Sequence, residues 1–362
     1  MGPAEGAARD AATRLLLPDV RRILVLRRRA LGDLLLTLPA VRALRESYPG
    51  ARVDLLVDRP LVRVVEGLPY VDRVVPFPDA ASMPRGRGRA LLALFRDVRR
   101  AGYDLVVDAL GTPRTAQLAW WSGARVRAGF AIRGRAWAYT VTVPRSDARR
   151  PVYMRDAYLE LVAAVGARTA DLSFAPAGSD SAEPRGSQPG GARAPGGPRV
   201  ALAPGATWPA KAWPPAHYAA LATRLIDEAQ AEVTIFWGPG EEARADQVVA
   251  AEPRARKAPP GDVAALARSL RAHDVLVSSD SGARHVAVGA GIATVGLFGP
   301  TDIPTATPPE GPHVTLTSPI ACAPCQRLTC PLAENFCLTR VLPGDVFAAA
   351  RQLIAAHAGA AP

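Results

Sequence analysis

The sequence predicts an α/β protein built from two doubly wound parallel sheets. Short apolar, β-branched runs alternate with longer segments whose apolar residues recur at helical spacing, and this alternation is typical of parallel sheets. It stops at residues 175–198, a stretch rich in Pro, Gly and Ser, and then starts again. We therefore expect a flexible lead-in at 1–20, a first domain at 21–174, a linker at 175–198 and a second domain at 199–362, with the two sheets facing a central cleft.

The first domain opens with the strand ILVLR, and apolar residues recur at helical spacing from Asp33 until YPG ends the helix. Two strands, an amphipathic helix and another strand are predicted next: ARVDLLVD (51–58), VDRVVPF (71–77), RALLALFRDVRRAGY (89–103) and DLVVDALG (104–111). The second domain repeats this order, with predicted elements RVALAPGA (199–206), PAHYAALATRLIDEA (215–229), EVTIFWGPGEE (232–242), DVLVSSDSG (274–282), ATVGLFGPTD (293–302) and a closing helix PGDVFAAARQLIAAHAG (343–359).

The charge of the chain is unevenly distributed. Residues 1–150 carry 27 basic and 14 acidic side chains, whereas residues 151–362 carry 17 and 19. A basic first domain indicates an anionic partner, although the excess of Arg over Lys also matches a simple bias in genomic base composition. Aromatic residues are sparse in the basic stretches, which disfavours nucleic acid as the partner. No apolar run approaches the roughly 20 residues of a membrane span and no signal peptide is evident, so we expect a cytosolic protein.

A strand-to-helix turn in the second domain is the first candidate site. Asp280, Ser281 and Gly282 follow an apolar strand, and His285 lies one helical turn further on. Such a turn directs free N–H groups and the positive end of a helix dipole outward, where a phosphate can bind. The alternative is a helix N-cap without a ligand.

Two further loops of the second domain carry polar residues. Thr207 and Lys211 follow the first strand, and a lysine there can serve as a point charge for a diphosphate or remain solvated. Glu241 and Glu242 follow the next strand, where one of them could bind a ribose diol or simply favour a helix start. In the first domain, Asp33 either caps a helix or faces the cleft and accepts a proton from an incoming hydroxyl.

Four cysteines lie within sixteen residues near the C-terminus, and their spacing is C-x2-C-x4-C-x6-C. In a cytosolic chain this pattern fits a structural metal ion or an iron–sulfur cluster better than disulfides, and reduced packing cysteines or a redox pair are the alternatives. The candidate ligands are Cys322, Cys325, Cys330 and Cys337.

The sequence resembles glycosyltransferase family 9, the ADP-heptose:lipopolysaccharide heptosyltransferase family, from about residue 22 to 350 apart from the linker. Four segments in the same order carry the resemblance: ILVLRRRALGDLLLTLPAVRALRESYPGARVDLLV, YDLVVDALGTPRTAQLAWWSGARVRAGF, VALAPGATWPAKAWPPAHYAALA and DVLVSSDSGARHVAVGAGIATVGLFGPTD. The cysteine segment also occurs in many members. The chain departs from the family at Arg284, where a small residue or Met is usual, and in the basic run at residues 27–29.

The resemblance implies a GT-B architecture of two Rossmann-like domains, with the donor nucleotide in the second. The implied reaction is metal-independent, inverting transfer of a sugar, with heptose from ADP-heptose the expected donor. The acceptor would be a lipopolysaccharide core or a similar anionic glycolipid held by the first domain, with the enzyme peripheral at the inner face of the cytoplasmic membrane. By motif position, Asp33 is the catalytic base. The donor would meet Thr207, Lys211, Asp280, Ser281, Gly282, His285 and either Glu241 or Glu242.

Other readings of the chain remain open at this level. A GT-B enzyme or binding paralogue could use a UDP- or GDP-sugar or another acceptor, and an epimerase could share the fold. The intact Asp33 argues against an inactive paralogue, and an epimerase has no need of a basic acceptor domain.

Overall fold

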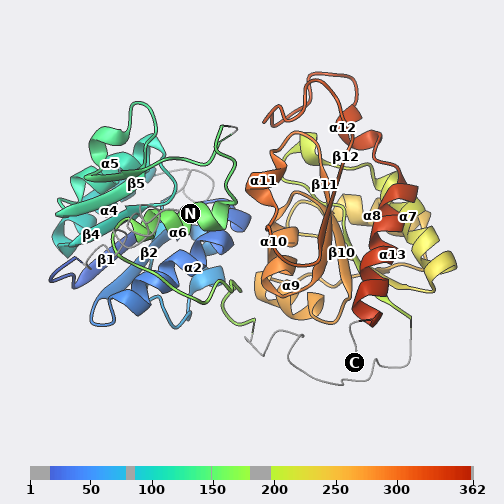
Figure 1. Cartoon of the computed structure of the whole chain (residues 1–362), viewed down its shortest axis with the longest axis horizontal. Helices are drawn as coiled ribbons and strands as arrows, with labels where there is room; N and C mark the ends of the chain where they lie inside the picture. Colours follow the sequence, from blue (N-terminus) through green and yellow to red (C-terminus); the bar gives the residue numbers. More distant parts are fainter. Residues whose placement is uncertain (1–16, 79–85, 148, 180–196, 360–362) are drawn as a thin grey trace, which may run out of the picture. The chain divides into compact units, whose positions relative to one another are not determined.

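The structure, a computed structural model, describes residues 17–78, 86–147, 149–179 and 197–359. The chain divides into two compact units, Met1–Ala177 and Gly178–Pro362 (Figure 1). Most of the expected lead-in and linker lies outside the described residues. Within the described part, no helix is long and apolar enough to cross a membrane.

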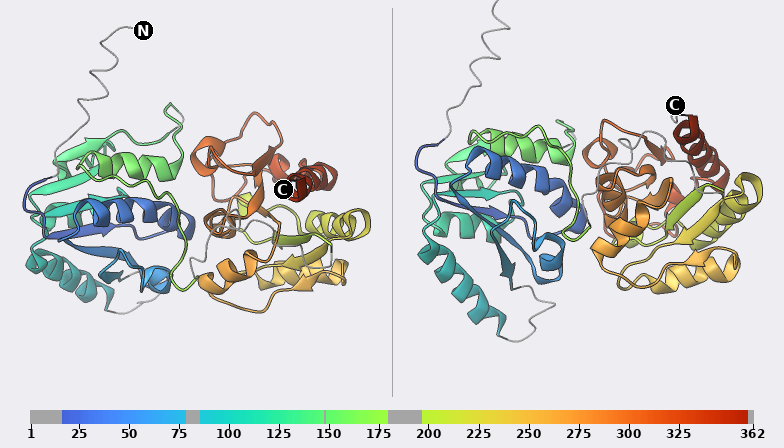
Figure 2. Two further views of the ribbon diagram at one scale, coloured as in Figure 1. Left: turned by 60° about the horizontal axis from the view of Figure 1, so that its bottom comes forward. Right: turned by 90° about the horizontal axis from the view of Figure 1, so that it is seen from below.

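The first unit contains a six-stranded parallel sheet with the strand order β3-β2-β1-β4-β5-β6. Helices α2 and α6 pack together on one face, and α4 and α5 pack together on the other (Figure 2). The elements are β1 (Arg22–Leu26), α2 (Leu31–Ser47), β2 (Arg52–Asp58), η1 (Arg59–Leu61), α3 (Val62–Val65), β3 (Arg73–Phe77), α4 (Arg87–Ala101), β4 (Leu105–Asp108), α5 (Pro113–Trp121), β5 (Val126–Phe130), η2 (Ala136–Ala138), β6 (Val141–Val143) and α6 (Met154–Ala163).

The second unit contains another six-stranded parallel sheet, with the order β12-β11-β10-β7-β8-β9. Helix α7 packs against α8 and α13, and α9 packs against α10. The elements are β7 (Arg199–Ala203), η3 (Pro209–Lys211), α7 (Pro215–Ala229), β8 (Glu232–Ile235), α8 (Glu242–Ala251), β9 (Arg256–Lys257), α9 (Val263–Leu270), β10 (Val275–Ser279), α10 (Gly282–Gly289), β11 (Ala293–Phe298), α11 (Ile303–Ala306), β12 (His313–Thr317), α12 (Phe336–Thr339) and α13 (Pro343–Gly359).

The two sheets confirm the predicted fold class, and both have the same topology. Counted along its own unit, each sheet has the strand order 3-2-1-4-5-6 of a dinucleotide-binding fold. In that order, strands are added toward one edge of the sheet up to the third strand and toward the other edge from the fourth strand on. This reversal of strand order lies between the first and fourth strands, which are β1 and β4 in one unit and β7 and β10 in the other. Ligands of open α/β sheets bind beyond the carboxyl ends of these central strands, so this edge of each sheet is where a site is expected.

Local sequence explains several helix boundaries. Thr112 and Thr115 form a reciprocal capping box at the start of α5, and Pro113 occupies its first turn. Gly102 ends α4 in the left-handed conformation at φ 62°, which is costly for residues with a Cβ atom. The Asp262 side chain accepts a hydrogen bond from the backbone of Ala265 and thereby caps α9.

Each unit has its own hydrophobic core. In the second unit, Val200 and Val275 from the central strands pack with apolar side chains of α7 and α13, including Leu221 and Val346. In the first unit, Leu24 and Val106 pack with side chains of α4 and α5. Fully burying side chains of this size contributes roughly 1.5–3 kcal/mol each, so the strands and helices are fixed firmly while the loops at their ends are free to carry polar groups.

Candidate functional site

A buried ion pair lies at the strand-order reversal of the second unit. Lys211 ends η3, in the loop after β7, and Asp280 follows β10 directly. Because β7 and β10 are hydrogen-bonded neighbours, these loops meet although they lie 69 residues apart. Lys211 Nζ is 2.6 Å from Asp280 Oδ2, and the two side chains are only 16% and 9% exposed. The structure therefore brings together two of the predicted donor-binding residues.

His285 and Trp208 lie next to this pair. His285 Nε2 lies 3.8 Å from Asp280 Oδ1, and Lys211 Nζ lies 4.3 Å from the centre of the Trp208 ring. Burial alone would raise the pKa of Asp280, but Lys211 and His285 beside it hold that pKa below its usual value. Asp280 is therefore a carboxylate at neutral pH, and its charge neutralises that of Lys211.

The start of helix α10 is able to bind an anion. Ser281 occupies the N-cap position with extended backbone and makes no side-chain capping hydrogen bond. Within the described residues its hydroxyl is buried and has no hydrogen-bond partner. The first-turn N–H groups, beginning at Gly282, carry the positive end of the helix dipole. A phosphate oxygen is the kind of acceptor that such a group of donors binds.

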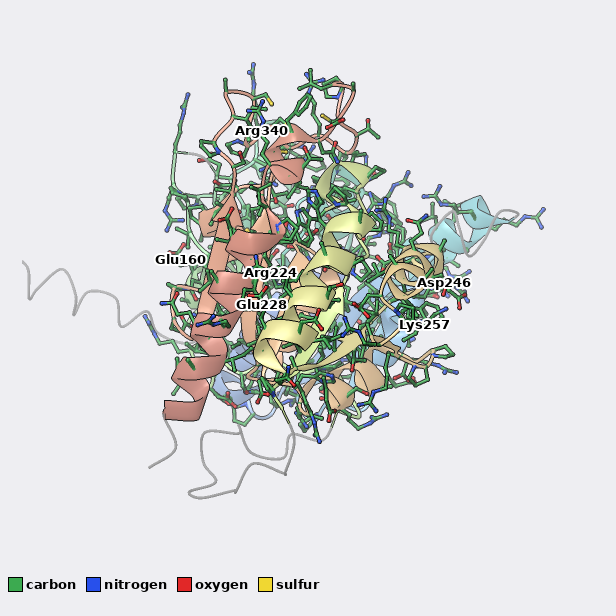
Figure 3. All side chains as sticks on the ribbon, turned by 90° about the vertical axis from the view of Figure 1, so that its right-hand side faces the viewer. Glu160, Arg224, Glu228, Asp246, Lys257 and Arg340 are labelled. Atoms are coloured by element: carbon green, nitrogen blue, oxygen red, sulfur yellow. The ribbon has the colours of Figure 1, made fainter. Side chains whose placement is uncertain are left out.

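The two adjacent glutamates have different surroundings. Glu241 Oε2 accepts a hydrogen bond of 2.9 Å from the backbone of Gly238, and its carboxylate packs directly against Gly205 in the turn after β7. Glu242 is instead paired with Lys257, which also contacts Asp246 (Figure 3). Of the two candidates, Glu241 is the one that lies beside the loop carrying Lys211. Thr207 is exposed in that same loop.

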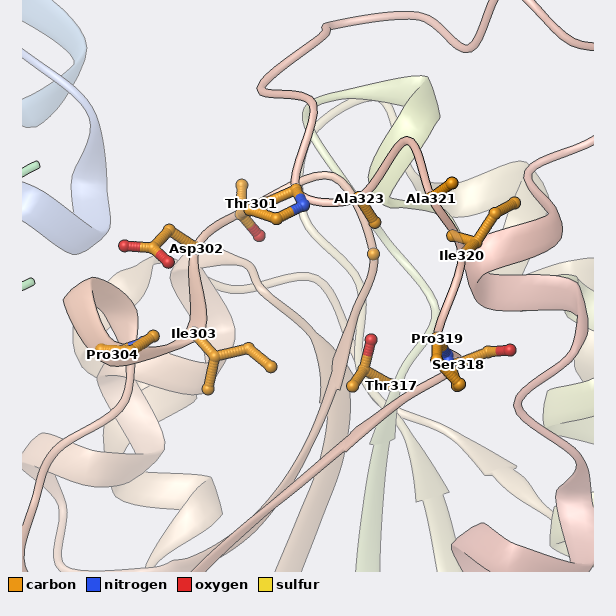
Figure 4. A pocket seen from close by; sticks show the side chains of 12 residues that line it. Thr301, Asp302, Ile303, Pro304, Thr317, Ser318, Pro319, Ile320, Ala321 and Ala323 are labelled. Atoms are coloured by element: carbon orange, nitrogen blue, oxygen red, sulfur yellow. The ribbon is translucent and has the colours of Figure 1, made fainter. Parts of the chain in front are cut away.

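A cavity of about 540 Å³ lies beside this loop cluster, beyond the ends of β11 and β12 (Figure 4). Its volume falls within the usual range for small-molecule sites. Thr301 lines the cavity and is also next to Asp280, where it contributes to the lowered pKa of that carboxyl. The other lining residues are Gly299, Asp302, Ile303, Pro304, Thr317, Ser318, Pro319, Ile320, Ala321, Ala323 and Pro324.

In the first unit, Asp33 lies at the corresponding edge of the sheet, in the first turn of α2. Arg27 Nη2 is 2.6 Å from Asp33 Oδ2, and the Tyr158 hydroxyl donates to Asp33 Oδ1 at 3.3 Å. The Arg27 side chain is buried, whereas the Asp33 side chain is 39% exposed. Asp33 is therefore an accessible carboxylate that is held in place from behind by a buried cation and a phenol.

The first unit also contains a fully buried acid near Arg27. Asp108 ends β4 and accepts hydrogen bonds from the backbone N–H groups of Leu110 and Gly111 and from the Tyr139 hydroxyl. Burial raises the pKa of Asp108 despite these hydrogen bonds. Arg27 is close enough to Asp108 for the charge of that carboxyl to help raise the Arg27 pKa, against the lowering effect of burial.

Sequence reasoning missed the role of the arginines at the end of β1. Arg27 and Arg28 are buried, and Arg28 Nε pairs with Asp58 Oδ1 at 2.8 Å. They belong to internal ion pairs and add little to the basic surface. Their position in the sequence could have indicated this role, because they directly follow a buried strand and precede a helix with Asp33 in its first turn. Tyr158 carried no such signal, because α6 is distant in sequence.

The four cysteines are free, and all of them line a second cavity, of about 140 Å³, in the second unit. Burial, and after it the neighbouring cysteines, raise the pKa of the Cys337 thiol. In the part of the chain that the structure describes, no group of three or more His, Cys, Asp or Glu side chains is placed to hold a metal ion. The cysteines thus gather at one place, but the structure shows no metal centre there.

Comparison with known proteins identifies the family. Residues 91–335 match the model of glycosyltransferase family 9 (heptosyltransferase). The chain belongs to glycosyltransferase family 9. This membership confirms the resemblance seen in the sequence and makes the protein a glycosyltransferase.

Several characterised relatives and solved structures are similar to this glycosyltransferase. It is 29% identical to lipopolysaccharide heptosyltransferase 1 of Pseudomonas aeruginosa, over 85% of this chain and 87% of the relative. It is 25% identical to lipopolysaccharide heptosyltransferase 1 of Escherichia coli K12, over 78% of this chain and 88% of the relative. The family 9 structure from Veillonella parvula superposes with a TM-score of 0.72 at 20% identity, covering 92% and 97% of the two chains. The structure of ADP-heptose lipopolysaccharide heptosyltransferase II of E. coli superposes with a TM-score of 0.69 at 19% sequence identity. The superposition covers 93% of this chain and 99% of the E. coli chain.

Proposed function

We propose that this glycosyltransferase transfers heptose, with inversion, from ADP-heptose to the core of a lipopolysaccharide or a similar anionic glycolipid. The relatives that cover most of the chain are lipopolysaccharide heptosyltransferases. The observation that carries the proposal is the buried Lys211–Asp280 pair beside the uncapped start of α10, since a cation and a group of N–H donors at a strand-order reversal suit a nucleotide diphosphate.

In this proposal the second unit binds the donor. Lys211, with Thr207 in its loop, meets the diphosphate, and the N–H groups from Gly282 onward together with Ser281 hold its oxygens. Asp280 positions Lys211 through Oδ2, and His285 lies near the other carboxylate oxygen, Oδ1. Glu241 is the better candidate for the ribose diol, because Glu242 is already paired with Lys257.

The chemistry requires stabilisation of the leaving group and one base. As the bond between the anomeric carbon and the phosphate oxygen breaks, negative charge builds on the diphosphate, and a lysine and a helix N-terminus stabilise this charge without a metal ion. The acceptor oxygen attacks from the opposite side of the sugar ring and loses its proton to Asp33. Arg27 and Tyr158 keep that carboxylate oriented while it remains accessible. The first unit would therefore hold the acceptor.

We propose further that the enzyme works as a peripheral protein at the cytoplasmic face of the membrane. The supporting observations are the basic composition of the first 150 residues and the lipid nature of the proposed acceptor.

We also propose a structural metal ion at the four cysteines. The support is that all four are free and surround one cavity. Because the described side chains are not placed to hold a metal ion, binding would require the cysteines to move closer together. A bound ion would displace their thiol protons and would tie the loop of Cys325 and Cys330 to Cys337 in α12. Metal analysis and thiol titration of the purified protein test this. One equivalent of metal per chain that is lost in Cys325→Ser supports the site, whereas four reactive thiols and no metal contradict it.

The donor site can be tested by calorimetric titration with ADP, UDP and GDP. We expect wild-type protein to bind ADP selectively and Lys211→Met to lose this binding. The chain has a matched control, because its other lysine, Lys257, lies in a surface ion pair, and Lys257→Met should bind ADP normally. Tighter binding of UDP or GDP would exclude an ADP-sugar donor, and failure to bind any nucleotide would contradict the donor site.

The catalytic step is tested separately with ADP-heptose and lipopolysaccharide that lacks core heptose. Asp33→Asn should bind ADP like the wild type but lose at least about 100-fold in transfer rate, the usual range for removing a general base. Asp97→Asn, which alters an exposed carboxylate on α4, is the matched control. Unchanged transfer by Asp33→Asn would exclude Asp33 as the base.

A further inference from the structure

Three of the six tryptophans of the chain lie exposed together in the first unit. Trp120 and Trp121 end α5, and Trp137 lies in η2, with exposures of 53%, 48% and 56%. The ring centres of Trp120 and Trp137 are 5.9 Å apart, and those of Trp120 and Trp121 are 6.5 Å apart. Phe95 of α4 contacts Trp121 with a centre distance of 6.5 Å. We call these four residues the aromatic patch.

Helix α4 extends the aromatic patch with an aliphatic side chain. Leu92 is 74% exposed and lies one helical turn before Phe95, so the two share a face of the helix. Neighbouring α4 and α5 lie side by side (Figure 1). Contiguous exposed apolar surface of this kind is uncommon on a protein that functions alone in solution, and it marks a surface for interaction.

The aromatic patch lies within strongly basic surroundings, so the expectation that the basic stretches carry few aromatic residues is wrong for this part of the chain. Residues 87–137 contain ten arginines and three aspartates, and one of the aspartates, Asp108, is buried. Exposed Arg96 and Arg99 follow Leu92 on α4, and the Arg99 guanidinium occupies the space beside Gly123, two residues after Trp121. Arg133 is exposed in the loop before Trp137. An anionic partner would therefore be attracted to the surface that carries the indoles.

We propose that the aromatic patch, with Leu92 and the surrounding arginines, docks the enzyme on an anionic phospholipid bilayer. Indole rings combine an apolar body with one N–H donor and concentrate at the boundary between lipid headgroups and hydrocarbon. Arginines lay their stems along apolar surface and direct their charge at anionic headgroups. This proposal rests on the proposed function, because docking on a membrane brings the enzyme to an acceptor that is a membrane glycolipid.

The geometry favours a bilayer over a single-stranded nucleic acid, which also binds aromatic and basic groups. Nucleobases stack on free ring faces. Here the Trp120 and Trp137 rings meet nearly edge to face at 68°, so each indole packs against its neighbour. An exposed leucine has no role in base stacking, but it can enter the headgroup region of a membrane.

The test is co-sedimentation of the full-length protein with vesicles of phosphatidylglycerol and phosphatidylethanolamine, compared with phosphatidylcholine alone. We expect binding to the anionic vesicles that weakens with salt, together with a blue shift of tryptophan emission. The double variant Trp120→Ser/Trp137→Ser and the single variant Leu92→Ser should each lower the partition coefficient, the double variant at least tenfold. Leu342→Ser, which alters a leucine of the second unit that is 55% exposed, should bind vesicles like the wild type.

Calorimetry with ADP on the same variants separates this proposal from the proposed function. Normal ADP binding by the tryptophan variant together with lost vesicle binding supports the docking surface. Vesicle binding that is unchanged in both variants, or absent in the wild type, overturns it while leaving the donor site intact. Binding of a single-stranded oligonucleotide that is lost in the tryptophan variant, without vesicle binding, would also overturn it.

Discussion

The ion pair between Lys211 and Asp280 allows a quantitative prediction about stability. Two unit charges about 4 Å apart attract by about 4 kcal/mol at an effective dielectric constant of 20, and part of this is offset by removing both groups from water. Breaking a buried pair costs about 3–5 kcal/mol, because it leaves one charge buried without its partner. Since Lys211 is 16% exposed, we expect Lys211→Met to lower the free energy of unfolding by about 3 kcal/mol.

A double-mutant cycle isolates the pair. Asp280→Asn alone should cost about 2 kcal/mol, since the flexible lysine can turn toward water. The double variant should cost about 2 kcal/mol rather than the sum of the two single effects, which gives a coupling energy of about 3 kcal/mol. Urea unfolding monitored by circular dichroism, with each transition fitted separately, measures all four proteins. A coupling energy below about 0.5 kcal/mol would refute a buried, direct ion pair.

Three further predictions follow from the structure. In Gly205→Ala the new methyl group would overlap the Glu241 carboxylate, so the affinity for ADP measured by calorimetry should fall about tenfold. Unchanged affinity would show that Glu241 does not contact the donor nucleotide. Burial, and then the nearby Arg284 charge, lower the pKa of His313 to about 4, so the folded protein binds fewer protons there than the unfolded chain. The free energy of unfolding should therefore rise by about 3 kcal/mol between pH 4 and 6.5, and His313→Gln should flatten that rise in urea titrations across this range. Tyr139→Phe removes a donor from buried Asp108 and should cost about 1–3 kcal/mol in urea unfolding, whereas a cost near zero would contradict that hydrogen bond.

The fold was predictable because its signal is local. Runs such as the one around Val275–Ser279 are apolar and short, and the helices between them show a regular apolar spacing, so each element is evident within about ten residues. The order of strands in the sheets was not evident, since it depends on contacts between distant segments. The equivalence of the two topologies appears only when β1 pairs with β4, and β7 with β10.

The position of the candidate site residues in loops after strands was predictable from the sequence, but their contacts were not. Loops after strands carry Lys211, Asp280 and Asp33 because parallel strands place such loops at one edge. Lys211 and Asp280 are 69 residues apart in the sequence, and Asp33 and Tyr158 are 125 residues apart. A local sequence pattern therefore cannot predict either contact. The surroundings of Glu241 likewise depend on how its loop packs against the turn after β7.

The ion pair in the second unit also has a consequence for selectivity among anions. A solvated lysine attracts any phosphate that diffuses past, and free phosphate would then compete with a larger ligand for the same charge. Lys211 is already neutralised by Asp280, so an incoming anion must displace that carboxylate before it gains the lysine. A single small ion has few other contacts to offset this displacement, whereas a ligand that also reaches the start of α10 and the neighbouring loops has several. If the ligand is the proposed nucleotide diphosphate, the internal salt bridge would exclude small ions from this site and admit the larger ligand that spans it.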